Sequence, residues 1–166
     1  KMSAKVSGYS HAVQVTPTVS TSPAYTAGDQ VGGIQTLTGV CLSRGSVSIL
    51  YSLTVIDKAK HNVELDLFFF DQLPTIASSD NAAFDLTDAN MALSCVGVVN
   101  VPSSAYKNSS SNSCASVLNV GLAIKCGSTD VTKAGDLYVV AVTRGTPTYA
   151  STSDLVFKYV FAQDGG

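Results

Sequence analysis

The chain has 166 residues, a length that suits a single domain with a hydrophobic core of its own. Only 13% of the residues are charged and the formal net charge is −2, so the surface is polar but weakly charged. Nucleic-acid binding is not expected, because phosphate recognition needs several convergent cations, and no apolar run is long enough for a membrane span.

The first part of the chain predicts an N-terminal arm followed by an edge strand. Residues 1–5 are polar and no apolar segment follows them, so no signal peptide is expected. In residues 11–19, Val13 and Val15 alternate with polar side chains, as in a strand with one buried face. Pro17 would interrupt the hydrogen bonds of a central strand, which favours a position at a sheet edge.

Residues 21–33 follow as a loop rich in glycine and other turn-forming residues, and residues 34–42 predict a strand rich in threonine. Only the turn 43–46 separates this strand from the next one. Two strands joined by so short a turn are expected to pair antiparallel.

The stretch 46–71 predicts the most regular β-structure of the chain. In its first half, apolar residues recur at every second position, which places them on one core face. The residues expected on that face are Val47, Ile49, Tyr51, Leu53 and Val55. A short polar connection, residues 57–61, leads into the second half, so the two halves are expected to form a hairpin.

The second half of that stretch predicts a strand that becomes buried on both sides. The residues that share its first face are Val63, Leu65, Leu67 and Phe69. The alternation is lost at Phe68 and Phe70, which indicates that the end of the strand is covered on its other face as well.

Residues 72–90 form a connection that is too long for a hairpin turn. Its last part and the residues after it, 87–94, predict the one short helix of the chain. Thr87 is the expected N-cap, and Asp88 in the first turn suits the positive end of the helix dipole.

The remaining segments alternate between strands and loops. Residues 95–101 predict a strand, and the serine-rich residues 103–113 predict a mobile surface loop. In residues 115–126 apolar and polar side chains alternate cleanly, as in a strand. Residues 137–142 are apolar on both faces and predict a strand that is covered on both sides. Residues 155–161 predict the last strand. The residues of 115–126 expected on one face are Leu118, Val120, Leu122 and Ile124.

These segments amount to about eight strands and one short helix, without an internal repeat. The fold class predicted is therefore all-β, an antiparallel β-sandwich that is jelly-roll-like or of another sandwich type. We expect residues 1–22 to form an arm and an edge strand, and residues 23–166 to form a single β-sandwich domain.

The four cysteines, Cys41, Cys95, Cys114 and Cys126, lack the spacing of a zinc site or a redox pair. The favoured expectation is four small buried hydrophobic side chains. A Cys114–Cys126 bond requires the chain to reverse between them, whereas that segment predicts one continuous strand. A Cys41–Cys95 bond or another pairing stays open.

No group of residues predicts catalysis, a cofactor or a metal ion. His11 and His61 lie in polar, turn-like segments and are expected to face solvent. Glu64 and Asp66 share one face of a strand at a spacing that glycoside chemistry could use, but the solvated outer face of an amphipathic strand is the favoured interpretation. The carboxylates of residues 80–88 lack the regular spacing of a calcium loop. We therefore expect a protein that is not an enzyme and has no cofactor.

Three tyrosines, Tyr25, Tyr106 and Tyr149, fall in expected loops. Exposed loop tyrosines are favoured contact residues at protein or sugar interfaces. The alternative is that they pin their own loops to the body of the domain, with their hydroxyls hydrogen-bonded there. The sequence leaves both interpretations open.

Several stretches resemble a family of structural proteins from tailed bacteriophages. The similar stretches occur in the same order along the chain and span most of it after Pro23. They are residues 24–33, residues 57–60 with the following strand 65–71, residues 80–84 and residues 144–150. Size and β content resemble capsid decoration (cement) proteins within that group.

The resemblance implies a virion component on the outer capsid surface, made in the host bacterial cytoplasm. It also implies the major capsid protein as partner and a homo-oligomer, with a trimer favoured. The hypothesis for contacts involves an arm of residues 1–9 and the loop 21–33. The candidate interface residues are Tyr9, Tyr25, Asp29, Tyr106 and Tyr149.

The alternatives are other binding proteins of a virion. One is a receptor-binding, lectin-like β-sandwich on a tail fibre or neck, which predicts exposed aromatic loops around a sugar groove. Another is a neck or tail-completion protein, which differs from a decoration protein in copy number.

Overall fold

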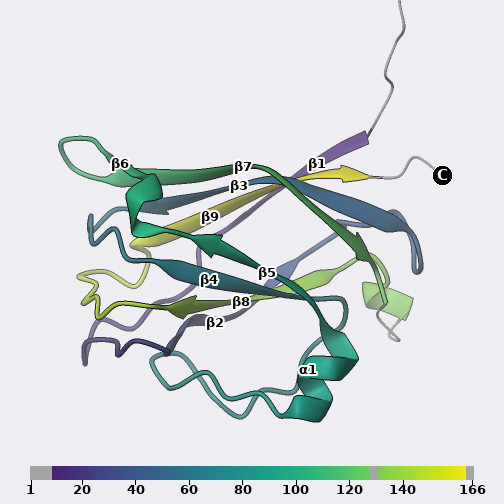
Figure 1. Cartoon of the computed structure of the whole chain (residues 1–166), viewed down its shortest axis with the longest axis horizontal. Helices are drawn as coiled ribbons and strands as arrows, with labels where there is room; N and C mark the ends of the chain where they lie inside the picture. The colour runs from purple at the N-terminus through teal and green to yellow at the C-terminus, as the bar shows by residue number, and fades with distance from the viewer. Residues whose placement is uncertain (1–8, 128–130, 164–166) are drawn as a thin grey trace, which may run out of the picture.

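The computed structural model of the chain describes residues 9–127 and 131–163 as an antiparallel β-sandwich with one α-helix (Figure 1). The strands are β1 (Tyr9–Val15), β2 (Gln30–Leu37), β3 (Val47–Asp57), β4 (Leu65–Phe70), β5 (Cys95–Val101), β6 (Tyr106–Asn108), β7 (Ser113–Lys125), β8 (Leu137–Thr143) and β9 (Leu155–Gln163). The helical segments are α1 (Asp88–Ser94) and the single turns η1 (Ser103–Ala105) and η2 (Val131–Lys133).

The strand order is that of a jelly roll. One sheet has the order β1-β9-β3-β7-β6 and the other β2-β8-β4-β5. The chain changes sheet at every connection between consecutive strands except β4–β5 and β6–β7. With the short β6 set aside, two four-stranded sheets face each other, as in a jelly roll built from two Greek keys. The predicted β-sandwich is confirmed, with β6 as a ninth strand.

The predicted hairpin over residues 46–71 is wrong, because β3 and β4 lie in different sheets. β3 pairs with β7 and β9, whereas β4 pairs with β5 and β8. The polar connection between them is an arch across the end of the sandwich. The Asp57 carboxylate holds this arch by accepting hydrogen bonds of 2.9 Å from the backbone N–H groups of Ala59 and Asn62.

The expected antiparallel pairing of residues 34–42 with the next strand is wrong for the same topological reason. β2 pairs with β8, and the short connection 38–46 again passes from one sheet to the other. β2 also begins at Gln30, inside the predicted loop. At the start of the chain, β1 is an edge strand paired with β9, and residues 1–8 of the predicted arm lie outside the described residues.

The main core fills the space between the two sheets and the smaller core lies on the outer face of the four-stranded sheet. In the main core the largest side chains are aromatic, among them Phe69 and Phe157, both 0% exposed. In the smaller core Phe70 and Val140 are packed under residues of the connection 72–94, including Phe84. Figure 1 shows this connection and α1 below the four-stranded sheet. The predicted double covering of β4 and β8 is therefore confirmed.

The predicted helix is confirmed at its N-cap. The Thr87 hydroxyl accepts a hydrogen bond of 3.3 Å from the backbone N–H of Asn90, and Asp88 lies in the first turn. β5 has the predicted bounds. The serine-rich segment 103–113 is more ordered than predicted, because η1 and β6 lie within it and Tyr106 packs into the core.

A bulge in β3 and β7 changes which side chains face the core. Leu50 pairs with Leu122 and Ser52 pairs with Leu118, so Tyr51 lies opposite three residues of β7. Asn119, one of those three, has a positive φ of 55°, which suits an irregular strand segment. The alternation of each strand therefore shifts its phase at this point.

As a result, the predicted core face of β3 is wrong in its first half. Leu53 and Val55 are buried as expected, but Val47, Ile49 and Tyr51 point outwards and are 36%, 42% and 54% exposed. The shift has a matching effect on β7. Leu118 is 68% exposed although it was expected to share a buried face with Ile124.

One disulfide, Cys41–Cys126, joins the β2–β3 connection to the residue after β7. The backbone in this region is tied together as well, since the N–H of Cys126 donates to the carbonyl of Ser46 at 3.1 Å. The expectation of four buried free cysteines is wrong, because two form this bond and Cys114 is exposed. The pair is 85 residues apart in sequence, and spacing alone gave no signal for it.

Candidate interaction face

Four of the five residues predicted to make interface contacts are buried. Tyr25 and Tyr149 are 1% exposed, Tyr106 is 7% exposed and Asp29 is 8% exposed. Of the five, only Tyr9 projects into solvent, with an exposed fraction of 64%. In this structure the three loop tyrosines pin their own loops to the sandwich, which is the second of the two interpretations left open by the sequence.

Tyr25 joins the 20–33 loop to the connection 72–94. Its hydroxyl donates a hydrogen bond of 2.7 Å to Asp80 Oδ1 and accepts one of 2.7 Å from the backbone N–H of Ser20. The same Asp80 oxygen accepts a hydrogen bond of 2.6 Å from the N–H of Gly32. Burial, and then the hydrogen bond to Asp80, raise the pKa of Tyr25 well above its ordinary value.

Tyr106 and Tyr149 anchor their loops by apolar packing instead. Their buried hydroxyls have no hydrogen-bond partner within residues 9–127 and 131–163, and burial is the main cause that raises the pKa of each. The Tyr149 ring packs edge-on against Tyr25 at 5.7 Å and against His61 at 5.3 Å between ring centres. Such buried groups are structural and present no polar atom to a partner.

We predict that removing the Tyr25 hydroxyl destabilises the fold whereas removing the Tyr149 hydroxyl does not. Tyr25→Phe leaves the Ser20 N–H without its partner and removes one of the two donors to Asp80 Oδ1, so it should cost about 1–3 kcal/mol of unfolding free energy. Tyr149→Phe removes a hydroxyl without a partner, so its effect should be close to zero or stabilising. Urea unfolding of both variants measures the difference, and equal losses would contradict the hydrogen bonding described above.

Glu64 and Asp66 are tied to their neighbours. Asn100 Nδ2 donates hydrogen bonds of 2.8 Å to both carboxylates, and Arg144 Nε forms an ion pair of 2.6 Å with Asp66. A glycosidase needs two carboxyl groups free to act on a bound sugar. This arrangement instead resembles a surface polar cluster that stabilises the β4–β5 edge.

The histidines and cysteines do not gather into a site. His11 Nε2 lies 3.0 Å from the Thr38 carbonyl oxygen and His61 Nε2 lies 2.8 Å from that of Thr148, so each contacts backbone. Within residues 9–127 and 131–163 there is no group of three or more metal-ligating side chains. Across the same residues, no helix combines the length and the apolar character needed to cross a membrane.

The most distinctive surface is the outer face of the strands β1, β9, β3 and β7, which we call the outer face. Ile49 lies between Ala123 and Ala162 across the sheet, and Ser52 lies between Leu118 and Val160. The apolar residues that point outwards here are Ala12, Val47, Ile49, Tyr51, Leu118, Ala123, Val160 and Ala162. The other sheet has its outer face covered by the connection 72–94, whereas no described segment covers this one.

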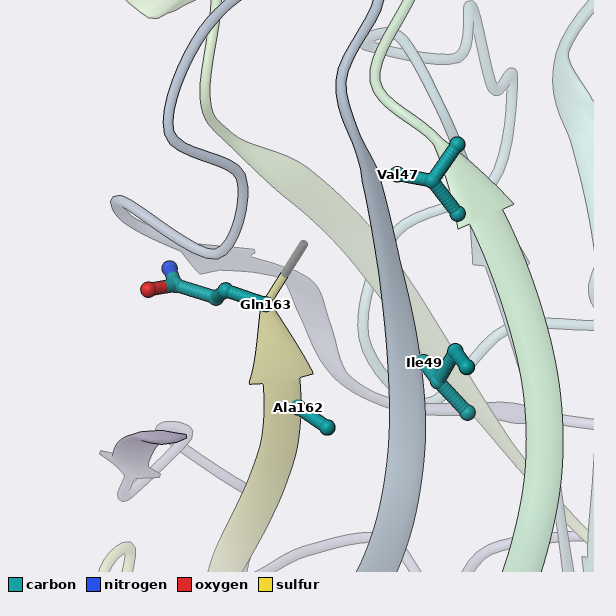
Figure 2. A pocket seen from close by; sticks show the side chains of 4 residues that line it. All are labelled: Val47, Ile49, Ala162 and Gln163. Carbon is teal, nitrogen blue, oxygen red and sulfur yellow. The ribbon is translucent and has the colours of Figure 1, made fainter. Parts of the chain in front are cut away.

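A hollow of about 280 Å³ lies at one end of the outer face, lined by Val47, Ile49, Ala162 and Gln163 (Figure 2). Ala162 and Gln163 point to opposite sides of β9, and the Gln163 amide donates to the carbonyls of the β2–β3 connection. Tyr9 is the strand partner of Gln163, so the exposed tyrosine shares the side of Gln163 and not that of Ala162. The lining is mainly aliphatic, which favours an apolar group over a polar ligand.

The charges around the outer face have one sign. Lys125 pairs with Val47 at one end, and Lys158 lies beside Thr54 towards the other. Lys107 of β6 points the same way as Cys114 of β7. None of the described residues that point outwards from these strands is a carboxylate. An apolar centre with a lysine-containing rim is the anatomy of a protein–protein contact surface.

The sequence interpretation missed this face because it placed Val47, Ile49 and Tyr51 in the core. Leu50 was the available signal, since it is an apolar residue out of phase with those three. A strand with apolar residues in both phases has either two covered faces or one face that is exposed and apolar.

No known protein family and no curated protein sequence matches this chain. The jelly-roll architecture is shared by viral capsid domains, lectins and cupins, so the fold by itself does not select a function. What bears on function is the outer face.

Proposed function

We propose that this protein is a non-enzymatic structural protein of a bacteriophage virion. More specifically, we propose a capsid decoration (cement) protein that binds the outer shell and stabilises contacts between capsid subunits. The partners in this proposal are the major capsid protein and further copies of the chain, with a trimer favoured. It is made in the host bacterial cytoplasm and acts on the outer capsid surface.

The observation that carries the proposal is the bare apolar outer face. Soluble monomers rarely leave a contiguous apolar patch of this kind uncovered, and such patches usually mark sites of protein–protein interaction. The chain covers the equivalent face of its other sheet with its own residues 72–94. That asymmetry supports a binding function for the uncovered face.

Two further features support binding over catalysis or sugar recognition. The carboxylates Glu64 and Asp66 already have amide and guanidinium partners. A lectin-like receptor-binding module would use exposed aromatic loops, whereas Tyr25, Tyr106 and Tyr149 are buried.

The Cys41–Cys126 disulfide supports a working location outside a reducing cytoplasm. Disulfides persist in oxidising surroundings and on virion surfaces, and are rare in the cytosol. A protein synthesised in the bacterium and exposed after lysis fits that pattern.

The test of the proposal is the copy number of this chain in purified virions of the phage that encodes it. Quantitative mass spectrometry gives the ratio of this chain to the major capsid protein. A ratio close to that of a shell component is expected. A ratio of a few per cent or less would instead place the chain at the neck or tail and favour the receptor-binding alternative. Its absence from the particle would overturn the virion proposal altogether.

A further inference from the structure

We propose that the outer face binds a second copy of this chain in a head-to-tail arrangement, with the surface formed by residues 71–94 of that copy as its partner. This proposal rests on the part of the proposed function that assigns binding to the outer face, and it names the partner that binds there. The two surfaces lie on different sheets of the sandwich, so one copy can present both at once.

The outer face is large enough for a protein partner. β3 has eleven residues, so at about 3.3 Å per residue, and with four strands about 4.8 Å apart, the face measures roughly 36 by 19 Å. The resulting area of roughly 700 Å² is close to the ~800 Å² that each partner contributes to a standard interface. A small ligand in the hollow beside Ile49 would leave most of this surface uncovered.

The charges disfavour the simplest dimer, in which two outer faces stack on each other. The described residues of the face include Lys158 at one end of its apolar centre and Lys125 at the other, and no carboxylate. In any such stack, lysines meet lysines or neutral groups, and like charges at an interface are unfavourable. The complementary partner is an apolar surface that has carboxylates and no cations.

Residues 71–94 of the chain form a surface of that kind, which we call the acidic cap. The segment contains four aspartates and no lysine, arginine or histidine. Asp85 and Asp88 are exposed, and so are two large apolar side chains, Leu73 at 56% and Leu93 at 68%.

The two exposed apolar side chains of the acidic cap belong to segments that are hydrogen-bonded to each other. The Gln72 amide donates to the Leu93 carbonyl at 3.4 Å, and Asn90 Nδ2 donates to the Thr75 carbonyl at 3.1 Å. These bonds hold residues 72–75 alongside α1, so that Leu73 and Leu93 lie in neighbouring segments. The cap thus offers exposed leucines near carboxylates, and the outer face offers exposed aliphatic residues near lysines.

A contact between two different surfaces is heterologous, and this has a consequence that an isologous dimer lacks. After two copies pair, one of them retains a free acidic cap and the other a free outer face, so association continues to a closed ring or an open chain. A trimer with three-fold symmetry also needs contacts of this heterologous type.

Sedimentation of two charge-reversed variants tests the arrangement. Lys125→Glu/Lys158→Glu puts acids on the outer face, and Asp85→Lys/Asp88→Lys puts lysines on the acidic cap. Each variant alone is expected to associate at least about tenfold more weakly than the unchanged protein, a difference of about 1.4 kcal/mol. An equimolar mixture is expected to regain association, because each variant's outer face is complementary in charge to the other variant's acidic cap. Lys58→Glu, in the arch between the sheets, is the matched control and should leave association unchanged.

Three results would overturn the inference. The first is an unchanged protein that stays monomeric up to about 0.5 mM, where contacts of millimolar Kd are already detectable. The second is undiminished association of both folded variants, and the third is an equimolar mixture that associates no more strongly than either variant alone. None of these results changes the copy number of the chain in the virion. Sedimentation and copy number together therefore distinguish a wrong partner for the outer face from a wrong proposed function.

Discussion

Loss of the Cys41–Cys126 disulfide is expected to lower the free energy of unfolding by about 4.5 kcal/mol, the chain-entropy value for a closed loop of this length. The bond closes a loop of 85 residues, which includes all of the strands β3, β4, β5, β6 and β7. Without it, the unfolded chain gains conformational freedom while the folded chain keeps both sheets. For a urea slope of about 2 kcal/mol per molar, the midpoint should fall by roughly 2 M.

Two comparisons measure this effect. The unchanged protein is unfolded in urea with and without a thiol reductant, and Cys41→Ala/Cys126→Ala is unfolded without reductant. Cys114→Ser is the matched control, because Cys114 is exposed and unbonded and its replacement should leave the midpoint in place. Mass spectrometry of the alkylated folded protein should show two free thiols, and the finding of four would contradict the disulfide.

Truncation of Leu50 is expected to destabilise the fold by about 2–5 kcal/mol, whereas truncation of its neighbour Ile49 should cost less than about 1 kcal/mol. Leu50 is 0% exposed and belongs to the main core, so Leu50→Ala removes apolar contacts and leaves a cavity. Ile49 is 42% exposed on the outer face. The two residues are adjacent on β3 and similar in size, so each variant is the control for the other.

Urea unfolding of Leu50→Ala and Ile49→Ala at low protein concentration decides which phase of β3 faces the core. Low concentration matters because association through the outer face would add stability that depends on Ile49. If Ile49→Ala proves the more damaging change, the core face predicted from the sequence is right and the bulge at Tyr51 is not. The outer face would then lose its apolar centre, and the head-to-tail proposal with it.

Short polar connections in this chain do not reveal which sheet the next strand joins. Residues 43–46 and 57–61 look like hairpin turns because they are short and polar. In the structure both lead across the end of the sandwich into the other sheet. Local residue types specify that the chain turns. Whether the next strand pairs with the preceding one or crosses to the other sheet depends on which other strands are available as partners.

The phase of alternation in β3 does not stay constant along the strand. Val47 to Val55 reads as one unbroken period of two, yet the inward side switches at Tyr51. The switch lies at a bulge where Tyr51 is an extra residue of β3 relative to β9 and faces three residues of β7, which follows β3 by more than fifty positions. A period of two read along β3 does not show where its pairing with these two neighbours shifts.

The sequence by itself determined the class of the fold, the positions of most strands, the helix with its Thr87 cap, and the double covering of β4 and β8. These follow from local rules, because side-chain periodicity and capping act over a few neighbouring residues. Only the tertiary structure decided the sheet to which each strand belongs, the Cys41–Cys126 bond, the burial of the loop tyrosines and the exposure of the outer face. Each of these depends on contacts between residues far apart in the chain, and their energies arise only when the whole sandwich has closed.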